Sequence, residues 1–282
     1  GTDNVAIGEA SLDAVTTGDN NTAVGDNAAG ATTTGSSNTA IGADALLLNS
    51  TASYNTAIGN DAMAANTTGA ENTAVGWDAL TANTTASNNV AVGTTALGAN
   101  TTGTDNVAVG AYALDANTTT SDNTAIGDNA LGANTAANNT AVGSSALLVN
   151  TTGTANVALG TSALAANTTA NSNTAIGKDA LLANTTGTRN VGVGASALKT
   201  ITTASYNVGV GNDVLGANTT GANNTGVGDQ ALGANTTGTE NTAVGSAALD
   251  ANTTGNYNSG IGFNSLTANT TGERNNAVGY GT

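Results

Sequence analysis

A 17-residue unit repeats along the whole chain, and this period limits the possible folds more than any other feature. Its most regular part reads Asn-(Thr/Val/Ser/Asn)-(Ala/Gly)-(Val/Ile/Leu)-Gly. Successive motif glycines are 17 residues apart, except that Gly143 follows Gly127 after 16, through a deletion near Ala137. Helix-pair repeats need about 33 residues or more. The period therefore predicts one coil of a parallel β-solenoid per unit.

The consensus coil, N-T-A-V-G-x-x-A-L-x-A-N-T-T-G-x-x, predicts where its strands lie. Alternation with period 2 places Thr22 and Val24 on one face and Ala23 on the other. The segment A-L-x-A-N is expected to form a second short strand. The glycine at the strand end, and the Gly or Ala after the Thr pair, are expected to make turns with positive φ.

Burial follows from stacking, because one coil cannot cover its own apolar face. We expect neighbouring coils to bury the Val/Ile and Leu columns. The predicted fold is all-β: a parallel β-solenoid (β-roll) of about 17 coils. Residues 1–282 are expected to form a single continuous repeat domain, a segment of a longer fibre.

The first residue of the motif is Asn in every copy. Two interpretations remain open: stacked amides that hydrogen-bond in a ladder, or a turn-forming Asn at the strand entry. The residues expected to form structural ladders are Asn21, Asn38, Asn55, Asn72, Leu46, Leu80 and Leu97.

Composition excludes several functional classes. The chain has no Cys and no His, so we expect no disulfide, no thiolate chemistry, no Ser-His-Asp triad and no common transition-metal site. Its net charge is −15, with only 4 Lys and Arg residues. Neither nucleic acid nor an anionic membrane surface suits such a chain. No apolar run is long enough to span a bilayer. We therefore predict a non-enzymatic protein without cofactors, nucleic-acid partners or membrane insertion.

Two stretches resemble known families. The segments 38–42 (Asn-Thr-Ala-Ile-Gly) and 4–8 (Asn-Val-Ala-Ile-Gly) resemble the YadA-like head repeats of trimeric autotransporter adhesins, although the period of 17 is longer than theirs. The longer unit that begins at Asn72 is similar to repeats of phage tail-fibre proteins. The resemblance implies a left-handed β-roll, a homotrimer, and an extracellular, cell-surface or virion location.

A trimer also suits the small Ala/Gly column, which would let backbones approach closely. We expect Ala23, Ala57 and Ala74 to lie near the contact between chains. The predicted function is a structural and adhesive fibre segment, a rigid shaft or head that presents variable residues to a cell-surface glycan or receptor.

Two alternative functions stay open. One is a self-assembling extracellular filament subunit with a mechanical role. The other is an ice-binding solenoid that uses Thr pairs such as Thr67 and Thr68. Adjacent strand residues point to opposite faces, so only one Thr of each pair would point outward.

Asp44, Asp61 and Asp78 share one column in three successive coils, where stacking would bring their carboxylates within about 5 Å of one another. A solvated acidic edge, a Ca²⁺ site and a hydrolytic carboxylate pair are the possible interpretations. We expect the solvated edge and assign no metal ligand.

Aromatic residues lie in the variable columns, outside the expected core, and Asn-x-Thr motifs recur with the repeat. Trp77, Tyr112 and Phe263 are candidate binding residues, because exposed rings can stack on sugars. A different column holds three tyrosines at positions 54, 206 and 257. The Asn-x-Thr motifs that begin at Asn66, Asn83 and Asn100 match glycosylation acceptors, which requires that their column faces solvent.

Overall fold

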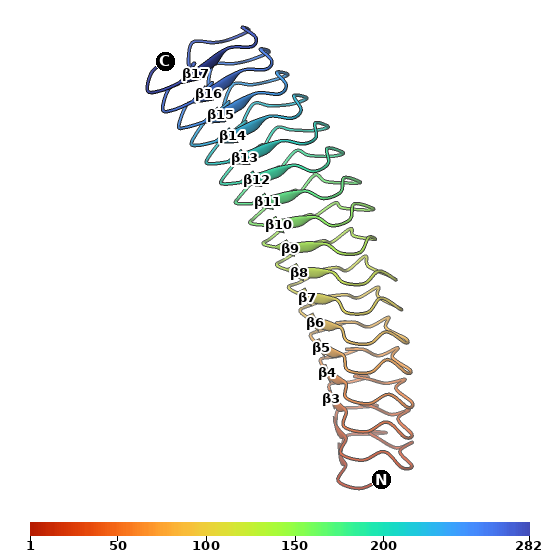
Figure 1. Cartoon of the computed structure of the whole chain (residues 1–282). Helices are drawn as coiled ribbons and strands as arrows, with labels where there is room; N and C mark the ends of the chain where they lie inside the picture. The colour runs from red at the N-terminus through yellow and green to blue at the C-terminus, as the bar shows by residue number, and fades with distance from the viewer. The chain divides into compact units, whose positions relative to one another are not determined.

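The computed structural model describes residues 1–282 and contains strands and turns but no helix (Figure 1). It accordingly has no helix long and apolar enough to cross a membrane. The predicted parallel β-solenoid with one 17-residue coil per repeat is confirmed. The chain divides into two compact units, residues 1–139 and 140–282. Their border falls within the coil that is one residue short.

Each coil contributes one strand of three residues, and each strand pairs in parallel with those of the adjacent coils in its unit. The register is one full repeat, so Thr22 pairs with Thr39, and Ala23 pairs with Ala40. The first unit contains β1 (Val5–Ile7), β2 (Thr22–Val24), β3 (Thr39–Ile41), β4 (Thr56–Ile58), β5 (Thr73–Val75), β6 (Val90–Val92), β7 (Val107–Val109) and β8 (Thr124–Ile126). The second contains β9 (Thr140–Val142), β10 (Val157–Leu159), β11 (Thr174–Ile176), β12 (Val191–Val193), β13 (Val208–Val210), β14 (Thr225–Val227), β15 (Thr242–Val244), β16 (Ser259–Ile261) and β17 (Asn276–Val278).

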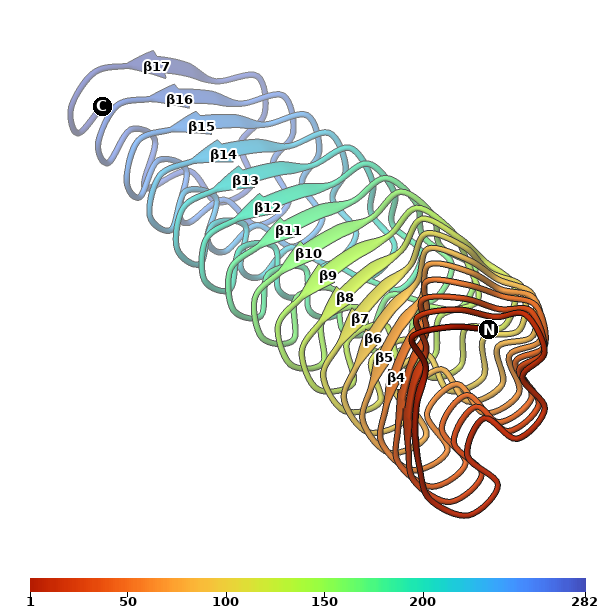
Figure 2. The same cartoon turned by 90° about the horizontal axis from the view of Figure 1, so that it is seen from below.

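The predicted second strand is wrong, because the A-L-x-A-N segment forms consecutive turns. Figure 2 shows the strands along one side of the coils and irregular turns on the other side. The turns still bond to the next coil: the Leu80 N–H, for example, donates to the Ala96 carbonyl at 2.9 Å. The solenoid is thus held by hydrogen bonds between coils well beyond its strands.

Positive φ recurs at fixed positions of the coil. The glycine at the strand end is one of them, as predicted: Gly76 has φ 140°. The glycine after the Thr pair does not have positive φ, so that part of the prediction is wrong. Instead the leucine itself is left-handed, with φ 53° at Leu80. This conformation costs an ordinary residue about 1–2 kcal/mol, and full burial of the leucine, worth about 1.5–3 kcal/mol, offsets that cost.

The core contains Leu and Ala, and the expectation that Val and Ile fill it is wrong. Leu46, Leu80 and Leu97 are completely buried, as are the strand-middle alanines except those of the terminal strands β1 and β17. The alternation along the strand is as predicted, but Ala faces inward and Thr and Val face outward. The cross-section explains this choice: a Cβ built on Gly192, a strand-middle glycine, would lie 3.4 Å from Leu181 Cγ. The leucine therefore leaves room for a methyl group and for nothing larger.

The motif asparagines form a buried hydrogen-bonded ladder. In a typical step, the backbone N–H of Asn72 donates to Asn55 Oδ1 at 3.0 Å, and Asn72 Nδ2 donates to the same oxygen at 3.2 Å. Asn72 Nδ2 also donates to the Ala86 carbonyl at 2.9 Å, across the coil. Asn21 and Asn38 make the same contacts. The amide ladder, rather than a local turn, is therefore the arrangement observed.

A second asparagine ladder runs through the column before the Thr pair. Asn83 Nδ2 donates to Asn66 Oδ1 at 2.8 Å and to the Ala86 carbonyl at 3.0 Å. Both residues, like Asn100, are completely buried. This column therefore does not face solvent, and its Asn-x-Thr motifs are inaccessible to glycosylation in the folded chain.

Candidate binding surfaces

The outward side of the strands forms a surface that we call the strand face: the first and third residue of each of β1 to β17. Every one is Thr, Val or Ile except Leu159, Ser259 and Asn276, and none is charged. They are half-buried or exposed, with Ile41 at 38 % and Ile58 at 36 % exposure. β-Branched side chains strongly prefer one χ1 rotamer. The strand face of each unit is therefore an ordered, uncharged array of methyl and hydroxyl groups.

This finding corrects the expected contact between chains. Ala23, Ala57 and Ala74 have no exposed surface within a single chain, so they cannot contact another copy. The small residues are needed inside the coil instead. Any contact between copies along this side must use the outward Thr, Val and Ile residues.

The Thr pairs present one hydroxyl each to solvent. Thr67 Oγ1 donates to the Thr84 carbonyl of the next coil at 2.9 Å, whereas Thr68 is exposed. The same bond recurs from Thr84 to Thr101 at 3.2 Å. The first Thr of a pair therefore stabilises the stack, and only a single row of outward threonines remains at this turn.

The acidic column that contains Asp44, Asp61 and Asp78 is half-buried, and two of its carboxylates accept hydrogen bonds from asparagine amides. Burial raises the pKa of Asp78 above its ordinary value, and the neighbouring Asp61 carboxylate raises this pKa further. No group of three or more acidic side chains is arranged to hold a metal ion.

Two other carboxyl groups have shifted pKa values. Burial raises the pKa of Asp115, although hydrogen bonds from its own backbone N–H and that of Ala116 act in the opposite direction. Hydrogen bonds from the backbone N–H and hydroxyl of Thr2 lower the pKa of Asp19. These shifts concern single side chains in separate coils and define no acid–base pair.

The candidate aromatic residues are all exposed but are not brought together. Trp77 and Tyr112 lie in the first unit, two coils apart, and Phe263 lies in the second. Phe263 does stack on Tyr280 in the next coil, with ring centroids 5.3 Å apart and 18° between the planes. The variable columns that hold these residues predict that the rings are exposed, but they do not identify a shared site.

Sequence reasoning missed a set of aromatic–cation pairs at the residue before the motif Asn. The Arg189 guanidinium lies 5.4 Å from the Tyr206 ring centroid, and that of Arg274 lies 5.2 Å from the Tyr257 ring. Each pair spans one repeat, so aligning Arg and Tyr in one column, 17 residues apart, would have revealed it.

The structure has no pocket. No protein-family model and no curated protein matches the chain.

Proposed function

We propose that the chain is a structural and adhesive fibre segment that assembles as a homotrimer through its strand face. The single observation that carries the proposal is the separation of side chains by column: the strand face is uncharged in every coil, while all charged residues lie in the turns. A chain of net charge −15 repels its copies unless the contacting surface is free of charge.

The area of the strand face can be worked out for each unit. Strands stack about 4.8 Å apart and rise about 3.3 Å per residue, so eight three-residue strands cover roughly 400 Å². The nine strands of the second unit cover a similar area. Each value is about half of the roughly 800 Å² that each partner buries in an interface of standard size.

The turns supply the second half of the function. Their exposed side chains differ from coil to coil and include the rings of Trp77, Tyr112 and Phe263. The buried Leu, Ala and Asn columns hardly vary, so substitutions at the exposed turn positions leave the core unchanged. This arrangement suits a scaffold that presents a variable surface to a glycan or receptor outside the cell, without catalysis.

Sedimentation of the full chain at micromolar concentration tests the proposal. We expect three times the chain mass for the native protein. The strand-face variant Val109→Asp should sediment as a monomer, since it places three like charges at the interface, whereas the turn variant Thr102→Asp should remain trimeric. A native monomer, or equal behaviour of the two variants, contradicts the proposal.

Ice binding is the second candidate function. The surface that favours it is the strand face and not the row of Thr pairs. Its Thr, Val and Ile side chains form a regular array with restricted rotamers, which is the type of surface that can order water. The test is thermal hysteresis of the chain in monomeric form. A freezing-point gap that Thr73→Lys abolishes would favour this function over assembly, and ordinary freezing would exclude it.

A further inference from the structure

One column of the second unit presents a continuous row of exposed polar and aromatic side chains, which we call the Tyr–Arg stripe. It occupies the residue before the motif Asn in six successive coils and consists of Arg189, Tyr206, Asn223, Glu240, Tyr257 and Arg274. All six are exposed. The order of residue types is symmetric about the middle of the column: Arg and Tyr begin it, Tyr and Arg end it, and Asn and Glu lie between them. No similar row exists in the first unit, where the column holds one aromatic residue, Tyr54.

The backbone sets the direction and spacing of the Tyr–Arg stripe. Its six residues all have positive φ, between 56° and 62°. Each backbone N–H donates to a carbonyl of the preceding coil, as Tyr206 does to Thr188 at 3.1 Å and Tyr257 does to Thr239 at 3.1 Å. Equal φ and equal hydrogen bonding give the side chains the same exit direction from the turn. The two tyrosines are three coils apart, or about 14 Å.

Each end of the Tyr–Arg stripe is a ring with a guanidinium group against it. Arg189 lies over the Tyr206 ring and donates to the Tyr206 hydroxyl. Arg274 lies over the Tyr257 ring and is 3.8 Å from a Glu273 carboxylate oxygen. These contacts hold the rings in place, and both rings keep about half of their surface in solvent.

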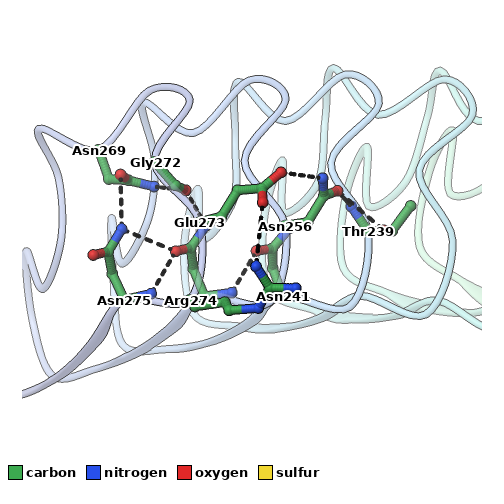
Figure 3. Close-up of polar contacts among 9 residues, drawn as sticks. Thr239, Asn241, Asn256, Asn269, Gly272, Glu273, Arg274 and Asn275 are labelled. Atoms are coloured by element: carbon green, nitrogen blue, oxygen red, sulfur yellow. Dashed lines mark hydrogen bonds and ion pairs between the residues drawn. The ribbon is translucent and has the colours of Figure 1, made fainter.

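The neighbouring column supports the end that contains Arg274, as Figure 3 shows. Glu273 Oε1 accepts from Asn256 Nδ2 at 3.0 Å. Asn256 Oδ1 in turn accepts from the backbone N–H of Thr239 at 2.8 Å and from its hydroxyl at 3.0 Å. A chain of contacts thus links three coils beside the Tyr–Arg stripe and orders the carboxylate next to Arg274.

We propose that the Tyr–Arg stripe binds a linear, neutral oligosaccharide that lies along the solenoid axis. Tyrosine rings combine an apolar face, which packs on the C–H face of a sugar ring, with a polar hydroxyl. The Asn223 amide and Glu240 carboxylate between them can exchange hydrogen bonds with sugar hydroxyls. A polyanionic glycan is disfavoured because the chain carries a net charge of −15.

The proposal names the ligand class for the adhesive half of the proposed function and therefore rests on it. The Tyr–Arg stripe lies in the turns, two residues before the first strand-face residue of each coil, so the sugar would bind beside the strand face rather than on it. A binding role for the Tyr–Arg stripe also explains why both arginines of the chain are in this column. Arginine stacks on aromatic faces better than lysine does.

Titration of the full chain with cellohexaose, chitohexaose and maltohexaose, followed by calorimetry and saturation-transfer NMR, tests the proposal. We expect at least one hexasaccharide to bind, with transfer from tyrosine ring protons. Tyr206→Ala and Tyr257→Ala should each weaken this binding about tenfold, or about 1.4 kcal/mol. Tyr257→Phe should retain most of the affinity because it keeps the ring.

The matched control is Tyr54→Ala, which removes an exposed tyrosine from the same column of the first unit and should leave affinity unchanged. The proposal is overturned if none of the three sugars binds at millimolar concentration, if Tyr54→Ala weakens binding as much as Tyr206→Ala, or if an alginate hexasaccharide binds more tightly than the neutral sugars. Sedimentation of the same samples separates the two proposals. A trimer that binds no sugar removes only the oligosaccharide site, and a monomer that binds sugar removes only the trimeric fibre.

Discussion

Replacing Gly226 by alanine should destabilise the second unit, although alanine is the consensus residue in the middle of the strand. A Cβ built on Gly226 would lie 2.7 Å from Val214 Cγ2, which is too close for two carbon atoms. Val214 is itself an exception: it is completely buried in a column where the other coils mostly carry Ala. The glycine thus accommodates the extra bulk of the valine.

The expected magnitude comes from two opposing effects. Overpacking of a core by a methyl group costs about 1–3 kcal/mol. Exchanging Gly for Ala in a strand contributes about 0.5–1 kcal/mol in the other direction. Gly226→Ala should therefore lower the free energy of unfolding by up to about 2.5 kcal/mol. The double variant Gly226→Ala/Val214→Ala restores the consensus pair and should remove the overpacking, with a coupling energy of about 1–3 kcal/mol.

Urea unfolding of the four members of this cycle, followed by circular dichroism, measures the coupling. The control is Gly192→Ala, in the same column, where the nearest atoms to a new Cβ lie at 3.3 and 3.4 Å. It should be neutral or stabilising by up to about 1 kcal/mol. Equal effects of Gly192→Ala and Gly226→Ala, or the absence of coupling with Val214, would refute an inward-facing alanine column.

Three further predictions concern single residues. Asn72→Ala removes the only acceptor of the buried Asn89 N–H and should lower the free energy of unfolding by about 2–4 kcal/mol, as measured by urea unfolding. The control is Asn60→Ala, at an exposed position, which should change stability by less than about 0.5 kcal/mol. Thr95, a β-branched residue at φ 53°, should be stabilised by replacement with Asn, with a rise of the melting temperature; a fall would show that the turn tolerates threonine without strain. The raised pKa of Asp115 means that folding disfavours its charged form. This loss of stability is absent below the unfolded-state pKa of 3.8, grows as the pH rises from there to the folded-state pKa, and is constant at higher pH. The melting temperature should therefore fall as the pH rises above about 4 and then level off, and Asp115→Asn should reduce that fall, whereas an unchanged pH profile would contradict the assignment.

The period and the residue types predict the solenoid because a 17-residue unit with one regularly repeated leucine position can bury its apolar residues only by stacking. The alternation of Thr22, Ala23 and Val24 also predicts that alternate residues share a face. The direction of the faces is not determined by hydrophobicity alone. Valine is the more apolar residue, but the leucine from the opposite turn fills the coil and leaves room only for a methyl group.

The turn conformation could not be predicted because it contradicts ordinary preferences. Leucine rarely adopts positive φ, yet Leu80 and its equivalents do so in nearly every coil. The burial of the Asn83 column was missed for a related reason: an Asn-x-Thr motif indicates a surface loop, whereas here the amide bonds to the coils above and below. Of the surface features, the exposure of Trp77 could be predicted from its variable column. The pairing of Tyr257 with Arg274 needed the stacking register.

Disulfide formation between copies tests assembly through the strand face most directly, because the native chain has no cysteine. In a symmetric trimer, equivalent strand-face residues of different copies lie at the same height and face one another. Mild oxidation of the Val92→Cys variant should therefore give covalent dimers on a non-reducing gel, while the Thr102→Cys variant, altered in an exposed turn, should stay monomeric on the same gel. Dimers from Thr102→Cys and none from Val92→Cys would contradict the account, because copies would then meet through their turns.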